Sequence, residues 1–404
     1  MNLGRPWRSV AFLVTTLGCG SGNPEANPTP HSIDMTPVGP LTMRPGDVAP
    51  LGIVVRDRHG DALFGHGAIT FSSSAPQVAT AAEVSPISWT LTAHAQGTAI
   101  IQAKLEGAVG QMTVKVTVWP RGDMDGGTFG AAARGSVVMV TTLNGIRRGG
   151  AHIVRVDPAS GSVQAEYDFS STYVALSADA SHAFFGNVVF DLASEAQTGA
   201  LVTDVNSCGD ITAAVERPQG SAMYLGCSVG VVVASSTGDI LGTIPTAAPV
   251  NSLALDPTGD HLYASAPSAG RVYEISTATS TLTRELPILG GPQTSVLPGG
   301  NELYESMEGE HQIERWDVSG PTEVDSLPIQ QALGAGPSGP FDLALSADGT
   351  RLLTSAGPYV IELDRPALTV TKTYWVGGVS RRIAVAGGSA LVANENGWVD
   401  VLPF

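Results

Sequence analysis

The sequence predicts an all-β protein, and three observations point to that class. Charged residues make up 14% of the 404 residues, whereas glycine and proline number 48 and 27. Few charges and many turn-forming residues are typical of short strands joined by tight connections. No long stretch shows the apolar period of an amphipathic helix. From residue 128 onward, small residues flanked by apolar ones recur about every 40 residues, which is the period of a four-stranded repeat.

The first 19 residues have the order of an export signal. Arg5 and Arg8 precede a short apolar run over residues 10–17, and small residues lead to Cys19. Residues 16–19 resemble the bacterial lipobox, although Leu17 lies one position later than is usual there. The resemblance implies a diacylglycerol anchor on Cys19 in an exported bacterial protein, on the outer membrane or cell surface. An ordinary secretory signal with an incidental cysteine is the alternative.

Residues 20–30 are rich in proline, glycine and asparagine, which predicts a flexible tether. Residues 31–119 predict a β-sandwich, because short apolar or alternating runs are separated by turn residues at regular spacing. The expected strands are 33–35, 41–43, 49–57, 69–72, 78–81, 88–93, 97–105 and 111–118.

This segment resembles the bacterial Ig-like group 2 domain. The resemblance is carried by five stretches: 44–47 (RPGD), 55–60 (VRDRHG), 70–79 (TFSSSAPQVA), 95–101 (AQGTAII) and 114–118 (VKVTV). It implies a spacer or adhesive module without catalytic residues. Residues 120–127 are then expected to be a linker. The RGD tripeptide at 121–123 is too short to indicate integrin binding, and the aspartates beside it lack the full spacing of a calcium loop.

Residues 128–404 predict a seven-bladed β-propeller. Seven small residues mark the first strands of the repeats: Ala131, Ala175, Ala214, Ala254, Ser295, Ala344 and Ala384. Small side chains are expected there because the innermost strands converge on one axis. The clearest repeat is residues 250–291, with strands expected at 252–256, 261–266, 270–276 and 281–287. After Ala384 only three strands fit, so the last blade is expected to stay three-stranded or to be closed by residues 116–119.

The repeats resemble the YVTN-type repeats of seven-bladed propellers and, more loosely, the lactonase-like propellers. Residues 253–259 (LALDPTG), 343–349 (LALSADG) and 174–179 (VALSAD) carry this resemblance. It implies the fold and leaves the activity open.

Two cysteines remain in the propeller. Cys208 and Cys227 flank the first hairpin of the third repeat, and the hairpin register brings them close together. In an exported protein such a pair is expected to form a disulfide. Two free thiols or a redox pair are the alternatives, although no C-x-x-C spacing is present.

The sequence argues against several kinds of site. A net charge of −16 disfavours nucleic acid, because phosphates require basic residues. The eight histidines are scattered without metal-ligand spacing, so we expect neither a metal nor a cofactor. Aspartates recur after the first strand of several repeats, at Asp179, Asp256, Asp260 and Asp348, where they are expected to stabilise turns.

The candidate binding residues lie at the start of each innermost strand, where one mouth of the channel is expected. They are Tyr173, Asp210, Asn251, Gln293, Asp342, Arg381 and Arg382. The alternative is that these side chains only satisfy hydrogen bonds at the rim.

We expect a non-enzymatic, lipid-anchored envelope protein whose propeller binds a protein or glycan partner, with the sandwich as a stalk. The alternative is a lactonase-like hydrolase with its site at the channel mouth, which requires several carboxylates or a His–Asp pair there. A purely structural spacer is the third hypothesis. No catalytic residue is assigned.

Overall fold

The computed structural model describes residues 29–404 apart from residues 65, 86, 144–150, 218–221, 288–294, 299, 321 and 335. The protein is all-β, as predicted. Helical structure in the described residues is limited to α1 (Ile329–Leu333) and the 3-10 turns η1 (Val205–Ser207) and η2 (Pro267–Ala269). Within these ranges, no helix is long and apolar enough to cross a membrane.

The amino-terminal part consists of two facing groups of strands, and each of the eight strands expected from the sequence overlaps one of them. One sheet has the order β1 (Ser32–Thr36), β3 (Val48–Arg56), β6 (Ser88–Ala93) and β5 (Ala79–Ser85). The other group has the order β2 (Leu41–Met43), β8 (Ala108–Val116), β7 (Gly97–Leu105) and β4 (Thr70–Ser73). In β8 buried and exposed residues alternate strictly, so one face of the strand enters the core.

The rest of the chain forms seven groups of four strands, here called sheets 1 to 7. Sheets 1 to 3 are β10 (Gly127–Arg134), β11 (Val137–Leu143), β12 (His152–Val156) and β13 (Val163–Tyr167); β14 (Ala175–Leu176), β15 (His182–Phe185), β16 (Val188–Asp191) and β17 (Ala196–Ala200); and β18 (Ile211–Glu216), β19 (Ala222–Cys227), β20 (Gly230–Ser235) and β21 (Ile240–Pro245).

Sheets 4 to 6 are also consecutive antiparallel meanders. They are β22 (Ser252–Leu255), β23 (His261–Ala266), β24 (Arg271–Ser276) and β25 (Thr281–Leu286); β26 (Ser295–Pro298), β27 (Glu302–Met307), β28 (Gln312–Asp317) and β29 (Thr322–Pro328); and β30 (Asp342–Leu345), β31 (Arg351–Ala356), β32 (Tyr359–Asp364) and β33 (Thr369–Trp375). Sheet 4 therefore has the four strands expected within residues 250–291, each within one residue of the expected bounds.

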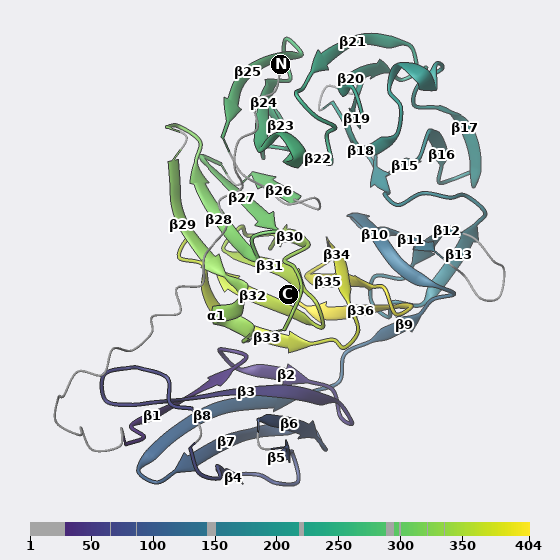
Figure 1. The fold of residues 1–404 in the computed structure, drawn as a ribbon. Coiled ribbons are helices and arrows are strands. Elements are labelled where there is room, and N and C mark those ends of the chain that lie inside the picture. The colour runs from purple at the N-terminus through teal and green to yellow at the C-terminus, as the bar shows by residue number, and fades with distance from the viewer. Residues whose placement is uncertain are drawn as a thin grey trace.

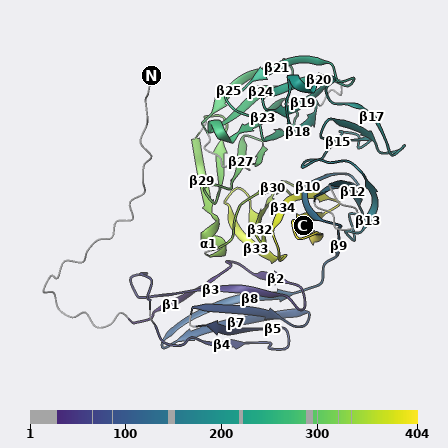
Figure 2. The same ribbon diagram turned by 45° about the vertical axis from the view of Figure 1, so that its right-hand side comes forward.

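The first strands of the seven sheets contact one another in a closed cycle, from β10 through β14, β18, β22, β26 and β30 to β34 (Ser380–Ala386) and back to β10. Figures 1 and 2 show the sheets following one another around a common centre, with the amino-terminal strands beside them. This arrangement is compatible with a β-propeller. The core is divided into separate apolar clusters that lie between neighbouring sheets.

Sheet 7 closes the ring in a way that the sequence did not predict. Its strands are β34, β35 (Ser389–Asn394), β36 (Trp398–Pro403) and β9 (Arg121–Asp123). The last sheet is therefore four-stranded, and residues 120–127, expected to be a linker, contain its outermost strand. Residues 116–119 do not close the ring, because Val116 ends β8 and pairs with both β7 and β2.

A buried carboxylate fixes the closing strand. Arg121 donates from Nε to Asp400 Oδ1 at 2.8 Å and from Nη2 to the Val376 carbonyl at 2.7 Å. The indoles of Trp119 and Trp398 also donate to Asp400, at 2.9 and 3.0 Å. Burial raises the pKa of the Asp400 carboxyl, and the hydrogen bonds from Arg121 and the two indoles oppose that rise. The arginine of the 121–123 tripeptide is thus part of the ring.

The amino-terminal strands join the ring at its outer edge. β2 pairs in parallel with β33, the outermost strand of sheet 6, so one eight-stranded sheet runs through both parts. Two further bonds flank this junction: Val38 N–H donates to the Ala332 carbonyl at 2.6 Å, and Thr373 Oγ1 donates to the Val38 carbonyl at 3.0 Å. The junction lies away from the inner strands that surround the centre of the ring.

The closing strand gives a stability prediction. A Cβ on Gly122 would lie 1.7 Å from the carbonyl oxygen of Gly161, which lies between β12 and β13 of sheet 1. Gly122→Ala must therefore push β9 away from sheet 1. We expect a loss of about 2 kcal/mol in the free energy of unfolding, measured by chemical denaturation. The matched control is Gly242→Ala in β21, where an added Cβ meets nothing within 4 Å. Equal losses in both variants would contradict this account of ring closure.

Candidate functional site

A cavity of about 270 Å³ lies at the centre of the ring, beside the starts of the inner strands, and we call it the start-side cavity. Six of the seven sheets contribute to its lining. Four of the small residues that marked the repeats, Ala131, Ala175, Ala214 and Ala254, are among the lining residues. Their short side chains leave the space that larger residues would fill. Four of the candidate binding residues also line it: Tyr173, Asn251, Asp342 and Arg382.

Two irregularities in the inner strands bear on which side chains reach this cavity. In β18 the register shifts between Ile211 and Ala213, which leaves Thr212 outside the regular pairing. In β34 it shifts between Ser380 and Ile383, so both arginines lie in the irregular segment. A β-bulge of this kind bends the strand and re-aims side chains. Thr212 and Arg382 both line the cavity, whereas Arg381 does not.

The charged groups of the lining are Asp342 and Arg382, which contact each other. Arg382 Nη1 donates to Asp342 Oδ1 at 3.2 Å, and the backbone N–H of Ile383 donates to Asp342 Oδ2 at 2.8 Å. The Asp342 side chain is 10% exposed and that of Arg382 is 36% exposed. The carboxylate is therefore held in the wall between sheets 6 and 7, while the guanidinium reaches solvent.

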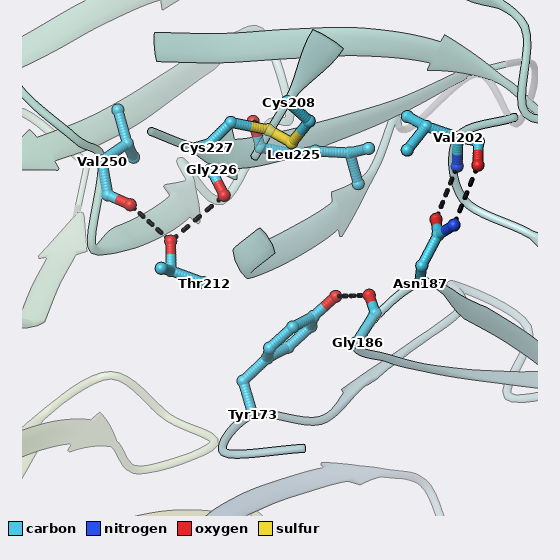
Figure 3. Close-up of a disulfide and its surroundings, with 10 residues drawn as sticks. All are labelled: Tyr173, Gly186, Asn187, Val202, Cys208, Thr212, Leu225, Gly226, Cys227 and Val250. Carbon is cyan, nitrogen blue, oxygen red and sulfur yellow. Dashed lines mark hydrogen bonds between the residues drawn. A yellow bond between two sulfur atoms is a disulfide. The ribbon is translucent and has the colours of Figure 1, made fainter. Parts of the chain in front are cut away.

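Two hydroxyl groups of the lining, those of Tyr173 and Thr212, bond to the cavity walls. Figure 3 shows the Tyr173 hydroxyl directed at the Gly186 carbonyl, to which it donates at 2.6 Å. Burial raises the pKa of Tyr173, so its phenol stays protonated. Thr212 Oγ1 contacts the carbonyl oxygens of Gly226 and Val250, and so links sheet 3 to the segment before sheet 4 (Figure 3). These groups hold the wall in place and leave no activated nucleophile among them.

Of the other three candidate residues, Asp210 and Arg381 are not among the residues that line this cavity. Asp210 is exposed just before β18. Arg381 contacts the carboxylate of Glu395, and its guanidinium carbon lies 4.1 Å from the ring centroid of Phe341. Gln293 lies outside the described residues. The sequence therefore placed four of the seven residues at one cavity, and the neighbouring arginines have separate roles.

The disulfide expected from the sequence is present. Cys208 and Cys227 are joined across the start of sheet 3, and both are fully buried. Figure 3 shows the bond near Thr212. It ties the segment that leads into β18 to the end of β19, at the same end of the sheet as the start-side cavity.

The recurring aspartates stabilise turns, as predicted. Asp348 Oδ1 accepts hydrogen bonds from the Ser346 hydroxyl and from both the backbone and the hydroxyl of Thr350. These bonds lower the pKa of Asp348 to about 2. Asp179 accepts equivalent bonds from Ser177 and Ser181. The carboxylates at this position are therefore committed to their own turns.

A second hollow of about 540 Å³, the end-side cavity, lies beside the ends of the inner strands of sheets 1 to 4. Arg134 Nε donates to the Ala178 carbonyl there at 3.2 Å, and the Ala178 N–H donates to Glu216 Oε2 at 2.6 Å. In the part of the chain that the structure describes, no three histidine, cysteine or acidic side chains come together as a set that could hold a metal ion.

The structure also contains a buried carboxyl that the sequence did not single out. Glu305 is 1% exposed, and neither of its oxygens has a hydrogen-bond partner among the residues that the structure describes. It lies opposite Glu314 in the β27–β28 register and on the same face as Leu303, which packs with Tyr263 of sheet 4. Burial raises the pKa of Glu305 well above its usual value, and the nearby Glu314 adds to the rise. The sequence of its strand, ELYESM, mixes polar and apolar residues, so no local pattern marks Glu305 as buried.

Comparison with known proteins assigns no family to this site. No protein-family model matches the chain, and no curated protein matches its sequence at a significant level.

The buried carboxyl gives a pH prediction. A carboxyl whose pKa is raised by folding stabilises the protein fully below its unfolded pKa, and that contribution is lost as pH rises through the folded pKa. Glu305→Gln imitates the protonated form at every pH. At pH 7 we therefore expect the variant to be more stable than the parent by at least about 1.4 kcal/mol, the equivalent of one pKa unit.

The measurement is the free energy of unfolding as a function of pH. The advantage of Glu305→Gln is expected to shrink to near zero at about pH 4, close to the ordinary pKa of glutamate. The exposed Glu83→Gln is the control, and it is expected to show no such trend. A pH-independent difference for Glu305→Gln would refute the assignment.

Proposed function

We propose that this chain is a non-enzymatic, lipid-anchored protein of a bacterial cell envelope. In this proposal residues 31–119 are an Ig-like group 2 stalk and residues 120–404 are a seven-bladed propeller of the YVTN type. The propeller binds a protein or glycan partner at the mouth of the start-side cavity.

The observation that carries the proposal is the chemistry of that cavity. Among the described residues, its lining contains one carboxylate, Asp342, which is buried against the Ile383 N–H and Arg382, and no histidine. Hydrolysis of a lactone needs a metal site or a general base that can reach the substrate. The guanidinium of Arg382 is partly exposed, and apart from Asp342 the described residues around it in the lining are uncharged. This combination favours binding over hydrolysis.

The position of the amino-terminal strands supports the role of a stalk. They pair with the outermost strand of sheet 6, so the start-side cavity is lined by strands on the opposite edge of that sheet. The disulfide supports an oxidising compartment, because such bonds persist outside the cytosol.

The anchor is tested by changing its cysteine. Cys19→Ala removes the thiol that would carry the lipid, and we expect the protein to move from the membrane fraction to the soluble fraction of lysed cells. Ser21→Ala keeps that thiol and is expected to remain with membranes. Membrane association that survives Cys19→Ala would exclude the anchor.

The binding role is tested by site-specific photo-crosslinking in intact cells. A photoreactive amino acid at position 210, exposed near the start-side mouth, is expected to capture one envelope component reproducibly. The control is position 239, exposed on the outer part of the same sheet, where capture of that component is not expected.

Two results would count against the proposal. One is equal capture at both positions or none at position 210. The other is lactone hydrolysis by the purified protein that is lost in Asp342→Asn, which would support the hydrolase alternative.

A further inference from the structure

We propose that Arg382 binds a carboxylate group carried by the partner, within the start-side cavity. This inference rests on the proposed function, because it names the chemical group that the binding site takes.

The guanidinium of Arg382 is positioned before any partner arrives. Its Nη1 donates to Asp342 Oδ1 at 3.2 Å, and Asp342 is itself fixed by the Ile383 N–H at 2.8 Å. The irregular pairing of β34 separates Arg382 from Arg381, which contacts Glu395 instead. A buried carboxylate thus orients one arginine toward the cavity, and less conformational entropy is lost when that arginine binds.

Arg382 keeps donors for a ligand. A guanidinium has five N–H donors in a planar fork, and among the described residues only Asp342 accepts from Arg382. Its side chain is 36% exposed. Two parallel N–H donors match the two oxygens of a carboxylate, which makes this the geometry that a guanidinium recognises best.

The other walls favour the same ligand chemistry. Apart from Asp342 and Arg382 the lining residues are uncharged, and many are glycine, alanine, serine or threonine. Among the described lining residues, Asp342 is the one anion that an incoming carboxylate would meet, and its oxygens already accept hydrogen bonds. The volume of about 270 Å³ is below the roughly 300–1,000 Å³ of pockets that enclose a whole small molecule. The cavity suits one terminal group of a larger partner.

The net charge of −16 argues that this recognition acts at short range. Long-range attraction to an anionic partner is not expected for an acidic protein. The interaction must then depend on the local fork geometry, which lysine cannot reproduce.

The experiment measures binding of small probes to the full-length protein by ligand-observed NMR. N-acetyl-glutamate amide and glucuronate carry the carboxylate on a peptide and on a sugar, and N-acetyl-glutamine amide and glucose are their neutral counterparts. We expect at least one acidic probe to bind at least tenfold more tightly than its neutral counterpart. The acidic probe that binds more tightly distinguishes a protein partner from a glycan.

Arg382→Gln is expected to weaken acidic-probe binding at least tenfold. Arg134→Gln, which removes the same charge at the end-side cavity, is expected to leave it unchanged. Because Arg382→Gln removes the cation that faces Asp342, Arg382→Lys is measured as well. This variant keeps the charge, loses the fork and is also expected to bind more weakly. Thermal unfolding verifies that each variant is folded.

The outcomes separate this inference from the proposed function. The inference is overturned if neither acidic probe binds more tightly than its neutral counterpart. It is also overturned if folded Arg382 variants bind the acidic probe as tightly as the parent protein does. Should crosslinking at position 210 still capture a partner in that case, the binding role stands without it.

Discussion

The structure depends on one buried contact, the carboxylate of Asp400 with the donors that surround it. A ring of sheets gains stability only when its last sheet packs against its first, and here the chain must return from residue 400 to residue 121 to achieve this. Arg121, Trp119 and Trp398 all donate to Asp400, whose side chain is fully buried. Removing the arginine would leave an uncompensated charge in the interior, which typically costs about 3–5 kcal/mol. In the chain, β9 directly follows the amino-terminal strands, and one of those strands, β2, pairs with sheet 6. Ring closure and the attachment of the amino-terminal part are therefore coupled through residues 117–120, which join β8 to β9.

Sheets 4 to 6 add a second constraint, which acts on the order of the sheets. Each carries a row of three ionisable residues at equivalent register positions on strands two, three and four. The rows are His261, Glu274 and Arg284; Glu302, Arg315 and Asp325; and Arg351, Glu362 and Lys372. The middle row has the opposite signs, and Arg365 of sheet 6 contacts Glu302 of sheet 5 at 3.3 Å. Ion pairs at a surface contribute little by themselves, but like charges brought together by a wrong sheet order would repel. On strands three and four, the signs at equivalent positions therefore alternate from sheet 4 to sheet 6.

The sequence predicted regular features well and failed where the chain departs from its own repeat. The strands of sheet 4 were placed within one residue, because β-branched and aromatic runs are bounded there by proline, glycine and aspartate. The aspartate turns followed from recurrence. The closing strand was missed because residues 121–123 contain glycine and two charged residues, which carry no strand pattern. It forms because Asp400, nearly 280 positions away, receives Arg121. Glu305 was also missed, since burial of a side chain between two sheets is not visible in a local pattern. Four rim residues were placed at one cavity, but the bulge that separates Arg381 from Arg382 could not be read from the sequence.

These departures also explain why the functional proposal centres on the start of β34. In sheets 2 and 3, residues at this level are small or form hydrogen bonds within the wall, as Tyr173 and Thr212 do. A strict repeat would surround the axis with equivalent groups and would leave no reason for a partner to bind in one orientation. Asp342 and Arg382 break that equivalence, because they introduce a single charged pair on one side of the cavity. The bulge breaks it again by pointing only one of two consecutive arginines inward. In the proposed role, Arg382 of sheet 7 would bind the entering carboxylate and Asp342 of sheet 6 would orient that arginine. The ring would then contribute rigidity, and two adjacent sheets would contribute the specificity.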